Sequence, residues 1–127
     1  MSSIDALLAQ ARSGLERIAP SDLGERMAEG ALVIDHRDSE DIAKEGQLPG
    51  AIIVRRSLLE WRLAPDSPDR LFHIPPDQVV ILVCSDGYSS SLAAATLQRI
   101  GIPRATDLIG GYRAWRVLRI GFERIRS

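Results

Sequence analysis

The sequence predicts an α/β fold, with a mostly parallel sheet at its centre and helices on both faces. Four short apolar runs, each about as long as a buried strand, recur along the chain and contain many β-branched residues. These runs cover residues 31–34, 51–54, 79–83 and 106–109. Segments with helical periodicity separate them, and strands that alternate with helices are joined by right-handed crossovers. We therefore expect the strands to run parallel and the crossover helices to cover both faces of the sheet.

The composition fits one small domain with a single core, since the chain has 127 residues, 45% of them hydrophobic and 26% charged. A net charge of −1 provides no bulk attraction to nucleic acid or to a membrane surface. No apolar run approaches the ~20 residues of a membrane span, and no secretory signal is expected at the N-terminus. One cysteine excludes an internal disulfide framework and fits a reducing, cytoplasmic compartment. The chain also has only two histidines, so we expect no metal site, and we expect no cofactor.

Residues 1–19 are predicted to form an N-terminal amphipathic helix, and residues 20–127 the main domain. The apolar side chains between positions 3 and 18 fall on one stripe of that helix. The stripe consists of Ile4, Leu7, Leu8, Ala11, Leu15 and Ile18. We expect it to pack on the rest of the chain, because an exposed apolar stripe is unusual in a monomer. A homodimer is also compatible with this stripe, and we assign no site chemistry to the segment.

Turn and cap residues mark the helices that precede the second strand. A short helix is expected within residues 20–30, ending near a glycine. Asp38 is placed to cap a second helix that continues to about Glu45, where Gly46 ends it.

The later helices are indicated in the same way. Residues 57–63 predict a helix, and residues 64–76, which contain four prolines, predict a surface loop. A last helix begins at the glycine pair 110–111. We expect Trp61 and Trp115 in the core, because each has a large apolar area.

Cys84, the only cysteine, directly follows the apolar run 79–83. A small polar loop that contains Gly87 comes next, and then a segment of helical periodicity. Backbone N–H groups and the helix dipole favour negative charge at such a position. We therefore expect a reactive cysteine there, because the thiolate is the nucleophile. The alternative is an inert cysteine that fills the core.

Charged residues gather at the carboxyl ends of the predicted strands. Asp35 and Arg37 follow the first strand, Arg55 and Arg56 the second, and Cys84 the third. In open parallel sheets, ligands bind outside the carboxyl ends of the strands. The sequence therefore predicts a ligand site where these residues meet.

Four motifs make the chain resemble the single-domain rhodaneses. In chain order they are VIDHRD from Val33, GQLPGA from Gly46, CSDGYS from Cys84 and GGYRAW from Gly110. The resemblance covers about residues 19–120 and follows the order and spacing of the family. It implies a rhodanese-like three-layer sandwich with a central sheet of about five strands. It also implies a thiosulfate sulfurtransferase activity without a cofactor, in which Cys84 carries a sulfane sulfur as a persulfide.

The resemblance also implies where the substrates bind. The donor would be a small molecule such as thiosulfate, and the acceptor cyanide or a thiol; a protein that accepts the persulfide also fits. The backbone and side chains of the loop after the cysteine would bind them, with Asp35 and Ser90 in support. That loop consists of Ser85, Asp86, Gly87, Tyr88 and Ser89.

Two loop residues make a separate source of positive charge necessary. Asp86 places a carboxylate in the loop and opposes a dianion by roughly 1 kcal/mol or more. Many family members close the loop with a basic residue where this chain has Ser89, although some bacterial members have serine there. We expect the charge first from Arg62, whose surroundings LEWR resemble a segment of some bacterial rhodaneses, and then from Arg37 or Arg56.

Several of these residues also have a structural explanation. Arg37 can be an ion-pair partner, the stem of Arg62 can cover apolar surface, and Asp35 can cap a turn. His36 and His73 are expected at the surface or behind the site.

Three classes of function compete for this pattern, and a sulfurtransferase is favoured. A cysteine phosphatase uses a similar loop but needs an arginine six positions after the cysteine, where this chain has Ser90. A non-catalytic binding module of the same fold, or a regulatory persulfide carrier, is the remaining alternative. Inactive members of the family usually lack the cysteine, which is present here.

Overall fold

A four-stranded parallel sheet forms the centre of the structure, a computed structural model that describes residues 2–126. Its strands are β1 (Leu32–Asp35), β2 (Ile52–Ile53), β3 (Val80–Val83) and β4 (Ala105–Asp107), in the spatial order β2-β1-β3-β4. β3 pairs with both β1 and β4, with Asp35 opposite Val83 and Leu82 opposite Asp107. The predicted α/β class with parallel strands is confirmed.

The sheet has one strand fewer than the five expected from the sequence. Beside β4 there is only a single parallel bridge, between Ile18 and Leu108. The N–H of Ile18 donates to the carbonyl of Asp107 and its carbonyl accepts from Ile109, both at 2.9 Å. Pro20 follows two residues later, and because it lacks an N–H it cannot extend this ladder. The N-terminal segment thus covers the edge of the sheet without forming a strand.

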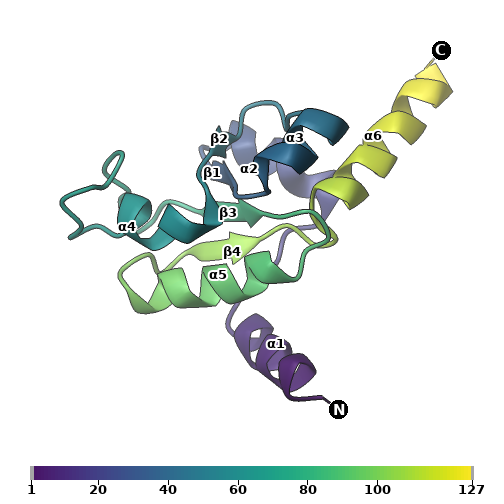
Figure 1. The fold of residues 1–127 in the computed structure, drawn as a ribbon. Coiled ribbons are helices and arrows are strands. Elements are labelled where there is room, and N and C mark those ends of the chain that lie inside the picture. The colour runs from purple at the N-terminus through teal and green to yellow at the C-terminus, as the bar shows by residue number, and fades with distance from the viewer. Residues whose placement is uncertain (1, 127) are drawn as a thin grey trace.

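Helices cover both faces of the sheet (Figure 1). They are α1 (Ser3–Ser13), α2 (Leu23–Ala28), α3 (Ser39–Glu45), α4 (Leu59–Leu63), α5 (Ser89–Arg99) and α6 (Gly111–Arg126), with the short 3₁₀ turns η1 (Pro20–Asp22) and η2 (Arg56–Leu58). Successive side chains of β1 and β3 enter two cores on opposite faces, as the pleat of a strand requires. The core on the side of α4 and α5 includes Ile34, Leu59, Leu63, Val80, Leu82 and Leu97. The core on the side of α2 and α6 includes Leu23, Val33, Ile81, Val83, Leu108 and Tyr112.

The N-terminal helix α1 is shorter than the predicted span of residues 3–18. It ends at Ser13, with Gly14 as its C-cap, and it packs against α5. The amide of Gln98 on α5 donates to the carbonyl of Gly14 at 3.0 Å and ties the end of the helix to the domain. Ile4 and Leu7 nevertheless remain 58% and 51% exposed, so only part of the apolar stripe is buried.

Asp38 is the N-cap residue of α3, which ends at Glu45 before Gly46 as expected, although the Asp38 side chain makes no capping hydrogen bond. The expectation that Trp61 lies in the core is wrong. Trp61 is 59% exposed and is not part of the core. Leu59 and Leu63, one helical turn apart, occupy the buried face of α4, and Trp61 lies between them in sequence and faces outward.

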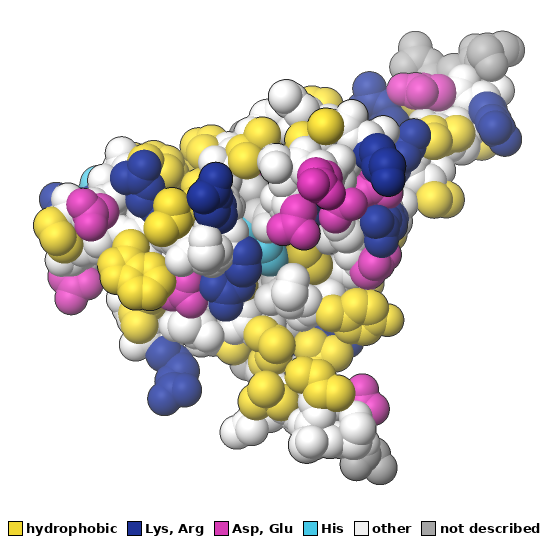
Figure 2. Space-filling view, in the orientation of Figure 1, with side chains coloured by type: hydrophobic (Ala, Val, Ile, Leu, Met, Phe, Trp, Pro, Cys, Tyr) yellow, Lys and Arg dark blue, Asp and Glu magenta, His cyan; other side chains and the backbone are white. Residues whose placement is uncertain are grey.

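The last helix, α6, begins against the sheet and then projects from the body of the molecule (Figure 1). Tyr112 in its first turn is buried, whereas Val117, Phe122 and Ile125 are exposed along the projecting part. Apolar and charged side chains therefore alternate on its surface (Figure 2). No helix within residues 2–126 is long and apolar enough to cross a membrane.

Gly111 is a point where the start of α6 touches the loop after β3, and its replacement tests this contact. Its φ is +65°, and a Cβ there would lie 2.5 Å from the carbonyl oxygen of Cys84 and 2.7 Å from the carbonyl carbon of Ser85. These are backbone atoms that cannot rotate away. Gly111→Ala is expected to lower the free energy of unfolding by roughly 2 kcal/mol or more, measured by urea unfolding.

Gly24→Ala is the matched control for this substitution. Gly24 lies in α2, its φ is not positive, and a Cβ there would meet no heavy atom within 4 Å. Alanine at this position should leave the stability unchanged or raise it by up to ~1 kcal/mol. Equal destabilisation by the two substitutions would contradict the contact described at Gly111.

Candidate active site

A pocket of about 330 Å³ opens at the carboxyl edge of the sheet, over the loop between β3 and α5. It is lined by His36, Arg37, Asp38, Asp41, Arg56, Cys84, Ser85, Asp86, Tyr88 and Ser89. The structure thus brings together the cysteine, most of its loop and two of the three candidate arginines. Among residues 2–126, no cluster of three or more His, Cys, Asp or Glu side chains could hold a metal ion.

The sulfur of Cys84 lies at the base of this loop, where backbone N–H groups point at it. The N–H groups of Gly87 and Ser90 lie 3.2 and 3.4 Å from Sγ, and Ser90 Oγ lies 3.2 Å from it. Because α5 begins at Ser89, the positive end of its dipole adds to these contacts. The N–H groups and the helix dipole favour the binding of an anion at this loop.

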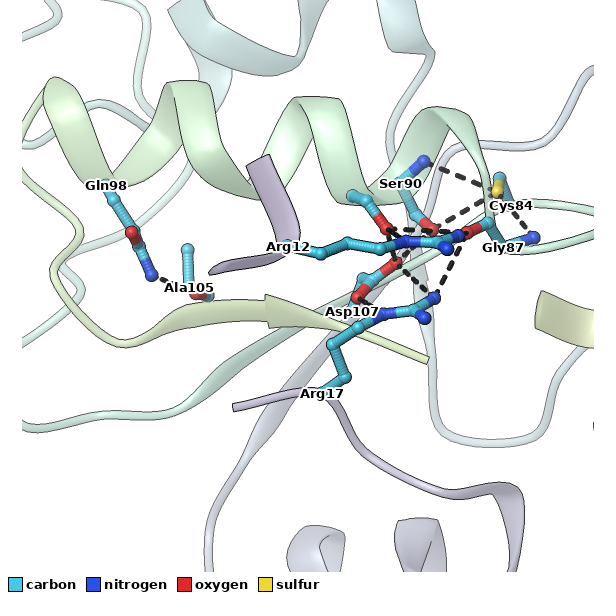
Figure 3. A network of polar contacts seen from close by, with 9 residues as sticks. Arg12, Arg17, Cys84, Gly87, Ser90, Gln98, Ala105 and Asp107 are labelled. Atoms are coloured by element: carbon cyan, nitrogen blue, oxygen red, sulfur yellow. Dashed lines mark hydrogen bonds and ion pairs between the residues drawn. The ribbon is translucent and has the colours of Figure 1, made fainter. Parts of the chain in front are cut away.

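Asp107, at the end of β4, is buried behind the sulfur and accepts three side chains (Figure 3). Ser90 Oγ and Ser91 Oγ donate to its Oδ2 at 2.8 and 2.7 Å. Nε of Arg17 donates to Oδ1 at 2.8 Å and forms an ion pair. Since Ser90 Oγ contacts both the sulfur of Cys84 and this carboxylate, it links the cysteine to the ion pair.

Two arginines of the N-terminal segment also reach the loop (Figure 3). Nη2 of Arg12 and Nη2 of Arg17 both donate to the carbonyl oxygen of Gly87, at 2.8 and 3.1 Å. The Arg12 guanidinium also lies 5.7 Å from the ring centroid of Tyr88, a 62% exposed residue at the pocket. Neither arginine is among the site residues predicted from the sequence. They are 75 and 70 residues from Gly87, so no local pattern could indicate these contacts.

Arg37 and Asp35 form a buried ion pair, with 2.7 Å between Nη2 and Oδ2. The guanidinium also donates to the carbonyl of Gly46 at 3.0 Å and lies 3.7 Å from the ring centroid of Tyr112. These contacts join β1 to the end of α3 and the start of α6. They correspond to the structural explanation that the sequence analysis offered for Arg37. Arg37 also lines the pocket, and within the described chain its buried Nη1 has no hydrogen-bond partner.

Arg56, at the start of η2, brings a positive charge to the pocket, whereas His36 does not. Of the two expected locations for the histidines, His73 lies at the surface, whereas His36 is only 4% exposed and lies within the site, where it lines the pocket. The pKa of His36 is lowered from 6.5 to about 4, mainly because the side chain is buried and secondly because Arg56 is positively charged. The imidazole is therefore neutral at pH 7. Arg56 is partly exposed and pairs with Glu60 at 3.0 Å.

The carboxylate of Asp86 is paired at the side of the pocket with Arg113 of α6. Nη1 of Arg113 lies 2.8 Å from Oδ2 of Asp86, and its Nε lies 2.9 Å from Glu45. The hydrogen bond from Arg113 lowers the pKa of Glu45. One arginine thus joins the loop to α3 and offsets part of the charge of Asp86.

Arg62, the first choice of the sequence analysis for binding the donor, is not brought to the pocket. It lies on α4, is not part of the pocket lining, and donates from Nη1 to the carbonyl of Asp69 at 3.2 Å. Arg56, six residues earlier in the 3₁₀ turn η2, lines the pocket where Arg62 was expected.

The chain matches known proteins over most of its length. Residues 19–118 match the family model of the rhodanese-like domain. The chain is 32% identical over 103 residues to a sulfurtransferase of Allochromatium vinosum, which covers 80% of this chain and 88% of that protein. It is also 32% identical over 104 residues to the thiosulfate sulfurtransferase GlpE of Ectopseudomonas mendocina, covering 82% and 87% of the two chains.

Solved structures share the fold as well. A Rhodopseudomonas palustris protein, described as of unknown function and a possible tyrosine phosphatase, has a TM-score of 0.80 and 30% identity. The match covers 94% of this chain and 92% of that one. The human single-domain sulfurtransferase TSTD1 has a TM-score of 0.65 at 24% identity, over 80% and 95% of the two chains. From the family match and the identity to its curated relatives, we conclude that the chain belongs to the rhodanese-like domain family.

Proposed function

We propose that this protein is a sulfurtransferase that moves a sulfane sulfur from a donor such as thiosulfate to a thiophilic acceptor through a persulfide on Cys84. The observation that carries the proposal is the pair of N–H contacts on Sγ from Gly87 and Ser90, at a pocket of about 330 Å³. The names of its relatives, sulfurtransferase and thiosulfate sulfurtransferase, support this substrate class.

The chemistry that this loop supports has two half-reactions. In the first, the Cys84 thiolate attacks the outer sulfur of thiosulfate, the S–S bond of the donor breaks, and sulfite leaves with the electron pair. The persulfide anion that remains is longer by one sulfur, and its charge lies where the loop N–H groups can stabilise it. In the second, cyanide or a thiolate attacks the outer sulfur and takes it, and the Cys84 thiolate is released. A protein thiol could accept the sulfur in the same way.

Arg56 is the pocket residue that we propose to attract the dianionic donor. Arg37 is fixed in a fully buried ion pair and His36 is neutral, whereas Arg56 pairs with Glu60 at the surface, where its side chain is 39% exposed and can turn to an incoming anion. The face of the molecule shown in Figure 2 carries positive and negative side chains interspersed, which fits the net charge of −1. The attraction is therefore local to the pocket rather than the effect of a broad basic surface.

Phosphatase chemistry has less support from this geometry. The hydroxyl of Ser90, at the position where a phosphatase loop needs its arginine, turns to the buried Asp107 carboxylate. The two other arginines at this loop, Arg12 and Arg17, contact the carbonyl oxygen of Gly87, so neither takes the place of the missing phosphatase arginine.

A persulfide carrier is a second alternative. A carrier that accepts the sulfur but releases it only to one specific partner would share the first half-reaction.

Cys84 is expected to take up one sulfur atom from thiosulfate, because it is the only cysteine and its sulfur lies in the anion-binding loop. Intact-mass measurement after incubation should show the added sulfur, which cyanide removes as thiocyanate. Cys84→Ser should fold but show neither the added mass nor thiocyanate production. A serine variant with full activity, or Cys84-dependent hydrolysis of an aryl phosphate, would speak against the proposal.

Arg56→Ala is expected to raise the KM for thiosulfate about threefold or more, with a smaller change in kcat. The partly exposed cation is lost from the pocket, and binding in the ground state and the transition state weakens alike. Arg62→Ala is the matched control, since Arg62 lies on the next helix and outside the pocket. If steady-state kinetics show the KM rising in Arg62→Ala and not in Arg56→Ala, our assignment is reversed.

The neutral His36 makes the stability of the protein depend on pH. The unfolded chain binds a proton on this residue near pH 6.5, whereas the folded chain does so only near pH 4. Stability from the neutral imidazole is therefore fully present above pH 6.5 and is lost as the pH falls toward 4. Between these limits, down to about pH 5, the free energy of unfolding should drop by roughly 1–2 kcal/mol. His36→Asn should show a flatter profile over this range in urea unfolding, and an unchanged slope would contradict the assignment.

A further inference from the structure

Gly87 is the residue at which the N-terminal segment and the sulfur of Cys84 meet. Its N–H lies 3.2 Å from Sγ, and its carbonyl oxygen accepts from Arg12 and Arg17 at 2.8 and 3.1 Å. Its φ is +84°, and a Cβ there would lie 2.7 Å from the backbone nitrogen of Gly110. The conformation of the loop at this point is thus held by backbone contacts on one side and by two guanidinium groups on the other.

The arginines also determine which way the next peptide group faces. A peptide unit is planar and trans, so the carbonyl of Gly87 and the N–H of Tyr88 point in opposite directions. Because the carbonyl faces Arg12 and Arg17, the N–H of Tyr88 is directed away from them. The two positive charges also polarise this peptide group, which makes its N–H a stronger donor.

The charges behind the loop favour an anion at Cys84 only if both arginines are counted. Asp107 is 0% exposed, and alone it would oppose negative charge on the nearby sulfur. Arg17 neutralises it through the ion pair at 2.8 Å. Arg12 makes no contact with Asp107; its Nε donates to Ser91 Oγ at 3.0 Å and its Nη2 to Gly87. One positive charge therefore remains uncompensated within this network, on the side of the loop opposite the pocket.

We propose that Arg12 and Arg17 are positioning residues of the active-site loop: both hold the Gly87 carbonyl, Arg17 neutralises Asp107, and Arg12 adds positive charge beside a loop whose one charged residue, Asp86, is paired with Arg113. The assignment of their purpose rests on the proposed persulfide function. It extends the functional unit beyond residues 19–118, the part of the chain that matches the family model. The N-terminal segment is then a component of the site and more than a covering for the sheet edge.

The decisive variant is Arg12→Ala, because removing Arg17 leaves a buried carboxylate unpaired and endangers folding. Two readouts are needed. The first is the rate of Cys84 alkylation by iodoacetamide as a function of pH, which reports one thiol because the chain has one cysteine. The second is the KM for thiosulfate. In Arg12→Ala, the midpoint of the alkylation profile should rise by about half a pH unit or more, and the KM by about threefold. Arg12→Lys, which keeps the charge, should retain most of the wild-type behaviour.

Gln98→Ala is the matched control for general loosening of the segment. Gln98 donates to the carbonyls of Gly14 and Ala105, both at 3.0 Å, and it makes no contact with the loop (Figure 3). This variant should lose some thermal stability while its alkylation profile stays that of the wild type. An equal shift in Gln98→Ala and Arg12→Ala would overturn the proposal, as would a folded Arg12→Ala with an unchanged profile.

The two readouts separate this proposal from the proposed function. Alkylation does not require sulfur transfer, so it tests the positioning of the loop even in a protein that forms no persulfide. A shifted alkylation profile in Arg12→Ala, together with no persulfide in the wild type, would leave the positioning in place and overturn the sulfurtransferase function. Persulfide formation with an unshifted profile would do the reverse.

Discussion

Parallel backbone pairing brings the carboxyl ends of β1, β3 and β4 level at one edge of the sheet. Cys84 follows the middle strand, so it is flanked by two strands that end in a buried aspartate, Asp35 and Asp107. A buried carboxylate without a partner costs several kcal/mol, and each of these two has its own arginine. Arg37 neutralises Asp35 from the same strand end, and Arg17 neutralises Asp107 from the N-terminal segment. The need to pair these two carboxylates shapes much of the surrounding structure, because the two arginines also tie α3, α6 and the cysteine loop to the sheet.

The parts of the molecule that the sequence could predict are those encoded locally. Apolar runs of strand length, and the glycine-containing loop after one of them, predicted the parallel sheet and the place of Cys84 at its edge. An ion-pair role for Arg37 could also be proposed from the sequence, because the partner that the structure shows, Asp35, is only two residues away. The fifth strand could not be judged in this way. Whether a strand forms beside β4 depends on Pro20, which ends the pairing after the single bridge at Ile18. The apolar pattern of that segment predicts a helix up to Ile18 and gives no sign of the bridge.

Other features of the site depend on contacts across the whole chain. Arg12, Arg17 and Asp107 belong to a network in which directly bonded residues are as many as 90 positions apart, and no spacing rule relates them. Asp107 ends β4, whereas the apolar run 106–109 had placed it inside the predicted strand, so its resemblance to Asp35 emerged only from the structure. The choice between Arg56 and Arg62 required knowing where the 3₁₀ turn η2 gives way to α4 and which side of α4 is buried. The neutrality of His36 likewise follows from its burial and from the charge of Arg56, and the sequence left open whether His36 lies at the surface or behind the site.

The single cysteine determines how this protein must be protected from oxidation. If Cys84 is converted to a sulfenic acid, no second thiol in the chain can capture it as an internal disulfide. Recovery must then come from a thiol on another molecule, and further oxidation to a sulfinic acid is not reversible by ordinary thiols. The 6% exposure of Cys84 and its position below the loop limit access to that sulfur. This enclosure therefore also restricts which external reductants can reach and repair the sulfur.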